Sequence, residues 1–247
     1  MSPDPADELH IWRASLVPGG ATLAELRSLL SADELQRATR FVFARDRDRF
    51  VAARGHLRCI LSRYLDIAPQ RLRFVYGPHG KPALERSAGV GIEFNLSHSG
   101  ELALVAITRD RRVGVDIELL RATLDYTPLL RDLFAPREQQ AFAGLPADEG
   151  RLRFFRGWVC KEAYIKACGE GLAHPPAAVE VEFPAHAPAV LRLPASATTP
   201  WSLYLLAPDQ DYAAAAVAEG PPLAVRLFDH SCDPQTAPRT SPSPGSH

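Results

Sequence analysis

The order of helix-like and strand-like segments constrains this chain most, because the two kinds come in two successive groups. The first group runs from residue 9 to residue 108, and the second runs from residue 113 to residue 218. Within each group, some segments repeat apolar residues with a helical period and others repeat them at every second position. This arrangement favours an α+β architecture of two similar halves.

We expect an N-terminal half at residues 1–111 and a C-terminal half at residues 112–229. Leu102–Thr108 and Tyr212–Ala218 are candidates for equivalent strands of the two halves, although their similarity is weak. Residues 230–247 are rich in proline and serine and have no apolar period, so we predict a disordered tail.

The individual segments are predicted from their periodicity and from their turn and capping residues. The predicted helices are Thr22–Leu30, Arg49–Tyr64, Leu129–Phe134, Pro136–Phe142 and Arg151–Cys168, and Gly169 ends the last of them. Ser31 and Glu34 form a capping-box pattern that begins a further helix. The predicted strands are Leu9–Leu16, Leu72–Tyr76, Ile92–Leu96, Leu102–Thr108, Val113–Glu118, Val179–Phe183, Val190–Leu193, Trp201–Leu206 and Tyr212–Ala218. We predict that Ser97–Glu101 is a polar loop.

Composition excludes several classes of protein. A chain of 247 residues with 46% hydrophobic content can bury a substantial core, as one domain or as two packed halves. Its net charge of −1 gives no general electrostatic reason to bind nucleic acid. The chain opens without a signal-peptide pattern and its apolar runs are too short to cross a bilayer, so we expect a cytoplasmic protein without membrane contact. The four cysteines are Cys59, Cys160, Cys168 and Cys232, and they have no CxxC or zinc spacing. Carboxylates are therefore the expected metal ligands.

The segment from Gln36 to Arg63 is strongly basic. It contains eight arginines against two aspartates, a local charge of +6, and it includes Phe41, Phe43 and Phe50. Three interpretations stay open: a solvated helix face, an RNA-binding patch, or a site for a phosphorylated ligand or an acidic protein.

Lysine is rare, with three lysines against 25 arginines. Lys161 and Lys166 lie in one predicted helix, and the third lysine is Lys81. Lysine offers a compact charge that fits beside a phosphate oxygen and a pKa that burial can move. The retained lysines are therefore candidates for a specific anion site.

Glu162 lies between the two helical lysines and falls on one helical stripe with Leu152, Phe155 and Val159. Its carboxylate is therefore predicted to point toward the core, where it must be paired, protonated or bound to a metal. The competing interpretation is an ordinary surface pair, because Glu162 and Lys166 stand at i and i+4.

Asp116 and Glu118 are two positions apart on a predicted strand, so their carboxylates project from the same face. A half-exposed strand with one polar side would also explain them. Together with Glu162 they supply three hard oxygen donors, which suit Mg²⁺. The lysines, the basic segment and the polar loop provide partners for phosphate.

Four motifs, in this order and spacing, resemble those of 4′-phosphopantetheinyl transferases. They are Gly80-Lys81-Pro82, Phe94-Asn95-Leu96-Ser97-His98-Ser99, Val113-Gly114-Val115-Asp116-Ile117-Glu118 and Trp158-x-x-Lys161-Glu162-Ala163-x-x-Lys166-x-x-Gly169-x-Gly171-Leu172. The resemblance covers about residues 8 to 220, and the most similar branch is the long, surfactin-synthetase-activating type. Arg37 and Arg40 depart from relatives that carry lysine in the corresponding segment, which leaves phosphate contacts there in doubt.

The resemblance implies a monomer whose fold is a pseudo-two-fold pair of α/β halves with the active site between them. It implies Mg²⁺-dependent transfer of the phosphopantetheine arm of coenzyme A to a serine of an acidic apo acyl or peptidyl carrier protein, with release of 3′,5′-ADP. The sequence does not indicate whether the carrier serves fatty-acid, polyketide or nonribosomal peptide synthesis. The alternatives are a non-catalytic coenzyme A or nucleotide-binding protein and an RNA-binding module.

The resemblance also implies roles for individual residues. The metal ligands would be Asp116, Glu118 and Glu162, and the catalytic residues would be Glu162 and Lys166. Coenzyme A would be bound by Arg49, Arg54, Lys81, Ser97, His98 and Lys166. Glu162 is the candidate base for the carrier serine, and Glu138 is a competing candidate. We predict that Lys161 faces away from the metal and has no catalytic role.

Overall fold

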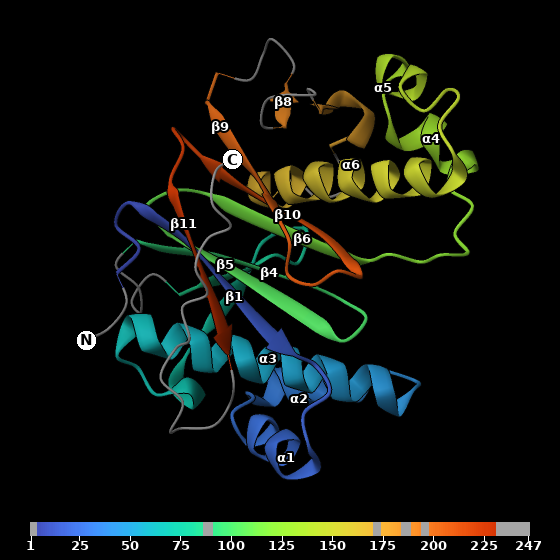
Figure 1. The fold of residues 1–247 in the computed structure, drawn as a ribbon. Helices are drawn as coiled ribbons and strands as arrows, with labels where there is room; N and C mark the ends of the chain where they lie inside the picture. Colours follow the sequence, from blue (N-terminus) through green and yellow to red (C-terminus); the bar gives the residue numbers. More distant parts are fainter. Residues whose placement is uncertain (1–3, 86–90, 170–173, 184–188, 194–197, 231–247) are drawn as a thin grey trace.

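Two long helices lie on opposite sides of a set of strands in the computed structural model (Figure 1). The structure describes residues 4–85, 91–169, 174–183, 189–193 and 198–230. Helix α3 (Ala44–Leu65) packs on strands of the first half, and helix α6 (Ala147–Cys168) packs on strands of the second half. No helix in these ranges combines the length and the apolar character needed to cross a membrane.

Each half has the same order of elements: a strand, a long helix and a hairpin of two strands. The first half contains β1 (Glu8–Ser15), α3, β4 (Ile92–Ser99) and β5 (Leu102–Arg109), and the second contains β6 (Val113–Leu119), α6, β9 (Trp201–Leu206) and β10 (Tyr212–Glu219). Both sheets place the last hairpin strand in the centre, in the orders β1-β5-β4 and β6-β10-β9, with antiparallel neighbours. The predicted α+β pair of similar halves is therefore confirmed.

The remaining elements are short and surround this frame. They are α1 (Gly20–Ser28), α2 (Ala32–Ala38), η1 (Pro69–Arg71), β2 (Phe74–Tyr76), β3 (Pro82–Leu84), α4 (Thr127–Leu133), α5 (Pro136–Gln140), η3 (Pro176–Ala178), β7 (Glu180–Glu182), β8 (Val190–Arg192) and β11 (Ala224–His230). The predicted capping box at the start of α2 is confirmed, because the Ser31 backbone N–H donates to Glu34 at 3.0 Å.

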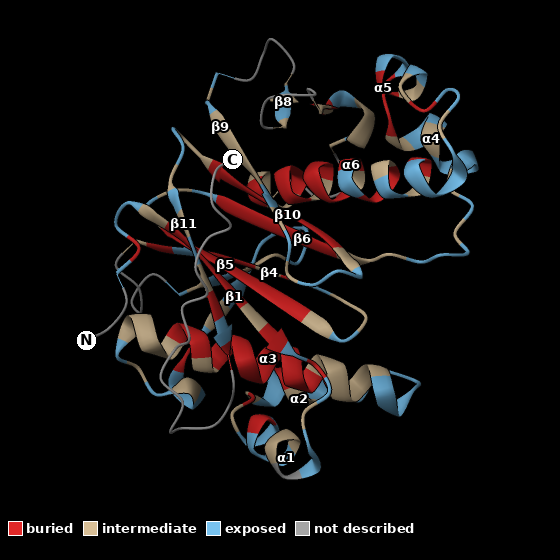
Figure 2. Cartoon of the chain, viewed as in Figure 1, coloured by how far each residue is buried: buried red, intermediate tan, exposed pale blue. Residues whose placement is uncertain are grey.

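Buried residues gather on the strands and on the inner faces of both long helices (Figure 2). In α3, Leu57, Ile60 and Leu61 are fully buried, and Leu65 is half-buried. Helix α6 ends where predicted, because Gly169 adopts a left-handed conformation with φ of 77° and its N–H bonds to the carbonyl of Ile165. The helical periodicity of the sequence therefore located both principal helices.

Strand β11 was not predicted. It follows the second half in the sequence but joins the sheet of the first half. It pairs with β1 in parallel, from Glu8 opposite Ala224 to Ala14 opposite His230. The predicted C-terminal half, 112–229, thus contains a strand that belongs to the sheet of the N-terminal half. Of the predicted tail, His230 is the last residue of β11, and residues 231–247 lie outside the described part of the chain.

The repeated register makes Trp12 of β1 the counterpart of Asp116 of β6. Trp12 pairs with Val105, the fourth residue of β5, and Asp116 pairs with Ala215, the fourth residue of β10. Trp12 stacks on Phe228 of β11 with ring centroids 4.5 Å apart. The position that Asp116 occupies in the second half is therefore occupied in the first half by Trp12, an aromatic residue.

The predicted polar loop at Ser97–Glu101 is wrong for its first three residues. Ser97, His98 and Ser99 are the last residues of β4, and Ser99 pairs with Leu102 across a two-residue turn. Polar residues suggested a loop, but the Ser97 and Ser99 side chains hydrogen-bond to a neighbouring strand.

Candidate active site

Three side chains at alternate positions of β4 hydrogen-bond to β6, the first strand of the other half. Asn95 Oδ1 accepts from the Val115 N–H at 2.9 Å, Ser97 Oγ donates to Asp116 Oδ1 at 2.8 Å, and Ser99 Oγ donates to Glu118 Oε2 at 2.8 Å. We call Asn95, Ser97 and Ser99 the polar ladder. Alternate strand residues share one face, so the two halves meet here through side chains.

Sequence reasoning missed Asn95 and Ser99 as individual functional candidates. The signal was present, because positions 95, 97 and 99 alternate, but the segment was interpreted as a loop after Leu96. Interpreted as a strand, it would have predicted one polar face directed at a partner.

Asp116 carries the most unusual hydrogen bonding in the site. Its side chain is buried, and its Oδ1 accepts from Ser97 and from Lys166 Nζ, which lies 2.5 Å away. Its Oδ2 is buried and has no hydrogen-bond partner among the described residues. A buried carboxylate oxygen without a partner is costly, so this atom is a candidate ligand for a cation.

Glu118 and Glu162 are half-buried near Asp116. Burial raises the pKa of both glutamates, and the negative charge of Asp116 raises both further, whereas the Lys166 ammonium acts in the opposite direction. A negative charge that raises the pKa of neighbouring carboxylates favours a shared cation or proton. Of these groups, Lys166 directly contacts Asp116, and both glutamates lie within the electrostatic field of that pair.

The predicted metal ligands have donor atoms that suit Mg²⁺, but they are not arranged as a formed metal site. Asp116, Glu118 and Glu162 supply the oxygen donors that Mg²⁺ prefers, and Asp116 Oδ2 is available. However, the described ranges contain no group of three or more His, Cys, Asp or Glu residues arranged to hold a metal ion. The Mg²⁺ site therefore stays a prediction.

The helical stripe that suggested an inward Glu162 is only partly correct. Phe155 and Val159 are buried, and Glu162 lines a cavity at half burial. Leu152 is 37% exposed and borders a surface hollow with Arg153 and Phe183, so its predicted inward position is wrong.

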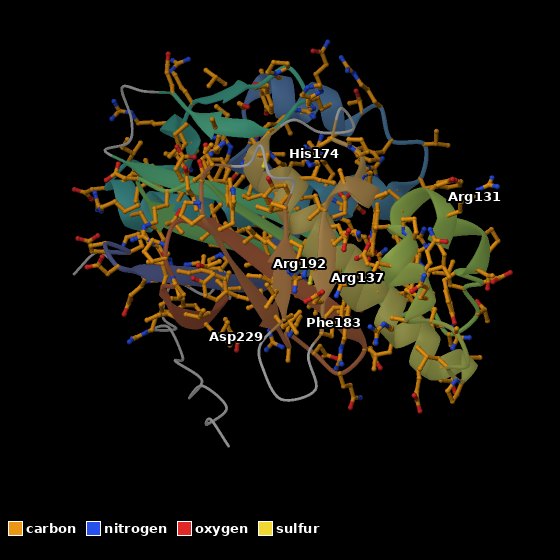
Figure 3. The ribbon with its side chains drawn as sticks, turned by 90° about the horizontal axis from the view of Figure 1, so that it is seen from above. Arg131, Arg137, His174, Phe183, Arg192 and Asp229 are labelled. Atoms are coloured by element: carbon orange, nitrogen blue, oxygen red, sulfur yellow. The ribbon has the colours of Figure 1, made fainter. Side chains whose placement is uncertain are left out.

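A cavity of about 330 Å³ lies between the hairpin β2–β3 and the C-terminal half of α6. Its walls include Lys81, Asn95, Glu162, Lys166 and His174. Figure 3 shows His174 apart from Arg137, Phe183 and Arg192, which belong to a different part of the second half. The cavity is large enough for part of a nucleotide-sized ligand.

Close packing of β6 on α6 brings Asp116 within reach of Lys166, which lines this cavity. Gly114 makes that approach possible, because a Cβ atom there would lie 2.0 Å from the carbonyl oxygen of Ala163 and 2.5 Å from the N of Ala167. Two residues along the strand stands Asp116, and α6 carries Lys166. The glycine was quoted in a motif, but the sequence alone did not reveal its steric role.

Arg49 and His98 are two further predicted coenzyme A ligands whose surroundings the structure describes. The Arg49 guanidinium is 3.6 Å from Glu101, and its Nε is buried without a hydrogen-bond partner in the described ranges. Desolvation lowers the pKa of His98, and the positive charges of Lys166 and Arg49 lower it further, although the residue is exposed. The positive charges of Arg49 on α3 and Lys166 on α6 thus both act on His98 of β4, and such a field favours an anion.

Arg54, predicted to bind coenzyme A, is engaged elsewhere. It is buried, its Nε donates to Glu34 Oε1 at 2.6 Å, and its Nη2 donates to Tyr76 at 3.2 Å. Glu34 also accepts from Arg58 at 2.7 Å. Arg54 therefore takes part in a buried ion-pair network between α2 and α3, and it does not line the cavity.

Lys161 and Glu138 form a separate buried junction. Lys161 is fully buried, and its Nζ donates to Glu138 at 2.7 Å and to the carbonyls of Pro176 and Val179. Glu138 also accepts the backbone N–H groups of Ala135 at 2.8 Å and Val181 at 2.9 Å. Because both Glu138 oxygens are occupied, the structure gives it no role as the competing base.

Comparison with known proteins places the chain in a family. Residues 112–217 match the model described as the 4′-phosphopantetheinyl transferase superfamily, and residues 15–110 match the N-terminal 4′-phosphopantetheinyl transferase model. The chain is 43% identical over 217 residues to 4′-phosphopantetheinyl transferase HetI from Nostoc sp., which covers 87% of this chain and 89% of HetI. The chain belongs to the 4′-phosphopantetheinyl transferase family.

A second relative agrees with this assignment. A putative 4′-phosphopantetheinyl transferase of Synechocystis sp. is 35% identical over 173 residues, covering 70% of this chain and 68% of that protein. Among solved structures, a holo-(acyl-carrier-protein) synthase from Bacillus anthracis in complex with CoA (3′,5′-ADP) is 22% identical, with a TM-score of 0.39 and coverage of 43% of this chain and 93% of that chain. The surfactin-synthetase-activating branch stays a prediction.

Proposed function

We propose that this chain transfers the 4′-phosphopantetheine arm of coenzyme A to a serine of an apo acyl or peptidyl carrier protein and releases 3′,5′-ADP. Family membership supports the reaction class. The observation that carries the proposal for this site is the buried Asp116, with one oxygen paired to Lys166 and the other unpartnered among the described residues, beside Glu162 and the cavity.

In the proposed reaction the serine oxygen attacks the phosphorus that bears the pantetheine arm, and the bond from that phosphorus to the ADP oxygen breaks. Glu162 accepts the serine proton, because its carboxylate lines the cavity together with Lys166. Lys166 neutralises charge on the departing phosphate. Asp116, Glu118 and Glu162 would hold Mg²⁺, which when bound supplies further neutralisation of the pyrophosphate.

Arg49 and His98 are proposed to bind the nucleotide end of coenzyme A. Arg49 Nε is buried and has no hydrogen-bond partner among the residues that the structure describes, and the positive charges of Lys166 and Arg49 act on His98. Both observations support an anion there. Arg49→Ala should weaken binding of coenzyme A more than binding of 3′-dephospho-coenzyme A. Equal losses for both ligands would assign Arg49 to a different part of the molecule.

The carrier is proposed to dock at the N-terminal end of α3. Phe41, Val42 and Phe43 are exposed large apolar residues, with Val42 at 89%, and the Arg45 and Arg47 side chains beside them also reach solvent. An apolar patch with a basic rim fits a partner whose surface helix is acidic at its edges. Reversing charge at Arg45 or Arg47 should slow association with the carrier and flatten its salt dependence, without changing the affinity for coenzyme A.

We further propose that the protein is of the surfactin-synthetase-activating type and works as a cytoplasmic monomer. One chain supplies β4 from the first half together with β6 and α6 from the second, and all three line or support the candidate site. A second copy is therefore not needed to complete it. Sedimentation of the active protein at one-chain mass would support this proposal.

Intact-mass analysis tests the activity directly. The protein is incubated with coenzyme A, Mg²⁺ and a panel of apo acyl and peptidyl carrier proteins, and each carrier is then weighed. The expected result is addition of one phosphopantetheine mass to at least one carrier, with loss of the reaction in excess chelator. Binding of coenzyme A without any carrier modification would instead favour the non-catalytic alternative. Modification undiminished by chelator would refute the proposed dependence on Mg²⁺.

A further inference from the structure

Lys81 directly precedes β3, and its side chain reaches the second half of the molecule. Its Nζ donates to the main-chain oxygens of Lys166 at 2.7 Å, Val113 at 3.2 Å and Ala167 at 3.4 Å. An ammonium group has three N–H donors, so these three carbonyls use its full capacity. A phosphate oxygen would have to displace one of them.

The three acceptors belong to the elements that carry the candidate catalytic groups. The carbonyls of Lys166 and Ala167 lie in the last turn of α6, where main-chain oxygens lack helical partners and carry partial negative charge. Val113 is the first residue of β6, the strand of Asp116. Burial lowers the pKa of Lys81, as expected for an ammonium removed from water.

Lys81 also forms a boundary between two hollows. It lines the cavity that contains Lys166, and it also lines a second hollow of about 410 Å³ whose walls include Glu93, Arg112 and Cys168. A side chain in this place fixes the hairpin against the end of α6 and separates the two spaces.

We infer that Lys81 is a positioning residue that holds the end of α6 and the start of β6 against the hairpin, and that it does not bind the 3′-phosphate of the nucleotide. The inference rests on the proposed function, and it replaces the direct contact with coenzyme A that the family resemblance implies for Lys81. Through the carbonyl of Lys166, Lys81 sets the place of the ammonium group that pairs with Asp116.

Lys81→Met tests this role, because methionine keeps an unbranched stem of similar reach but has no N–H donors. Transfer is measured with coenzyme A and with 3′-dephospho-coenzyme A on any apo carrier that the wild-type protein modifies. The expected result is a fall in kcat of at least about tenfold for both donors, with the ratio of their KM values within twofold of wild type. Lys81→Arg retains donors and should recover part of kcat.

A second readout needs no activity. Hydrogen exchange of the ligand-free protein should accelerate at least about tenfold in Lys81→Met at the end of α6 and in the hairpin 77–84, with α3 unchanged as the internal control. If the methionine variant does not fold, Lys81→Gln is compared in the same way, because its amide can make two of the three bonds.

Two results would overturn the inference. A KM increase at least tenfold larger for coenzyme A than for the dephospho donor would show that Lys81 binds the 3′-phosphate. Unchanged kcat together with unchanged exchange would show that the three carbonyl contacts position nothing. Absence of transfer by the wild-type protein would refute the proposed function only, because the exchange comparison would still test the role of Lys81.

Discussion

Replacing Gly114 with alanine should separate β6 from α6 and disable the site without touching any charged group. The added Cβ would lie 2.0 Å from the carbonyl oxygen of Ala163 and 2.5 Å from the N of Ala167. Both are main-chain atoms inside a helix, so no side-chain rotation can relieve the overlap. The strand or the helix has to move.

The size of the movement follows from these distances. Ordinary contacts of a Cβ atom begin at 3.4 Å, so the shortfall from 2.0 Å is 1.4 Å. Overpacking of this kind typically costs about 1–3 kcal/mol, which for a chain of this size lowers Tm by roughly 2–12 °C. Asp116 is two residues away on the same strand, and a displacement of about 1 Å at a reacting group costs about 100-fold in rate.

Transfer kinetics and thermal unfolding of the purified variant measure both effects. We expect kcat to fall by about 100-fold while the variant still unfolds cooperatively at a lower Tm. Gly20→Ala is the matched control, because a Cβ there meets nothing within 4 Å, and it should leave both quantities unchanged. A Gly114→Ala protein with wild-type Tm and at least a third of the wild-type kcat would refute the steric argument.

Four further perturbations test other parts of the structure. Ser99 positions the Glu118 carboxylate, so Ser99→Ala should weaken the binding of Mn²⁺, used in place of Mg²⁺, by about tenfold in an electron paramagnetic resonance titration. Ser99→Thr should restore the affinity. Equal affinity in all three proteins would contradict this role of Ser99. Lys166→Arg should lose most of the transfer rate because a planar fork replaces a compact ammonium, whereas a near-normal rate would make Lys166 an ordinary surface residue. Lys161→Met should lower the free energy of unfolding in urea by about 3–5 kcal/mol, and adding Glu138→Gln should recover part of the loss; a single variant as stable as wild type would contradict the buried junction. Burial lowers the pKa of His230 to about 3 from 6.5, so below about pH 6.5 the unfolded chain binds a proton that the folded chain excludes. The free energy of unfolding should therefore fall, as the pH is lowered below about 6.5, by up to about 1.4 kcal/mol per pH unit. His230→Gln should flatten that fall, and identical pH profiles of the two proteins would disprove the role of His230.

Local pattern was enough to predict the elements whose signals are contained within their own residues. Strand β6 was predicted from the alternation that begins at Val113, and the end of α6 was predicted from Gly169. Strand β11 has apolar residues at Val225 and Leu227, but its pairing depends on β1, which lies more than 200 positions earlier. Such a short segment next to a polar, proline-rich tail gives no local sign of its partner.

The charged residues of the candidate site could be predicted from the sequence, but the contacts of the neighbouring cationic side chains could not. The resemblance named Asp116, Glu162 and Lys166, and the structure places them together. The partners of Arg54 and Lys81 were not predictable, because a long cationic side chain can reach many acceptors and tertiary packing decides among them. Motif membership therefore indicated where these two residues stand in the chain but not what they contact.

The parallel pairing of β1 with β11 has a consequence for how the chain acquires its structure. β1 stands near the start of the chain, and its β11 partners stand 216 positions later. During synthesis, one edge of the first sheet stays open until residues 224–230 have left the ribosome. Open strand edges recruit other chains, and contacts this distant in sequence form slowly. The first sheet is therefore complete only when β11 has paired, whereas leading domains commonly finish folding first. Until then the edge of β1 is open to other chains.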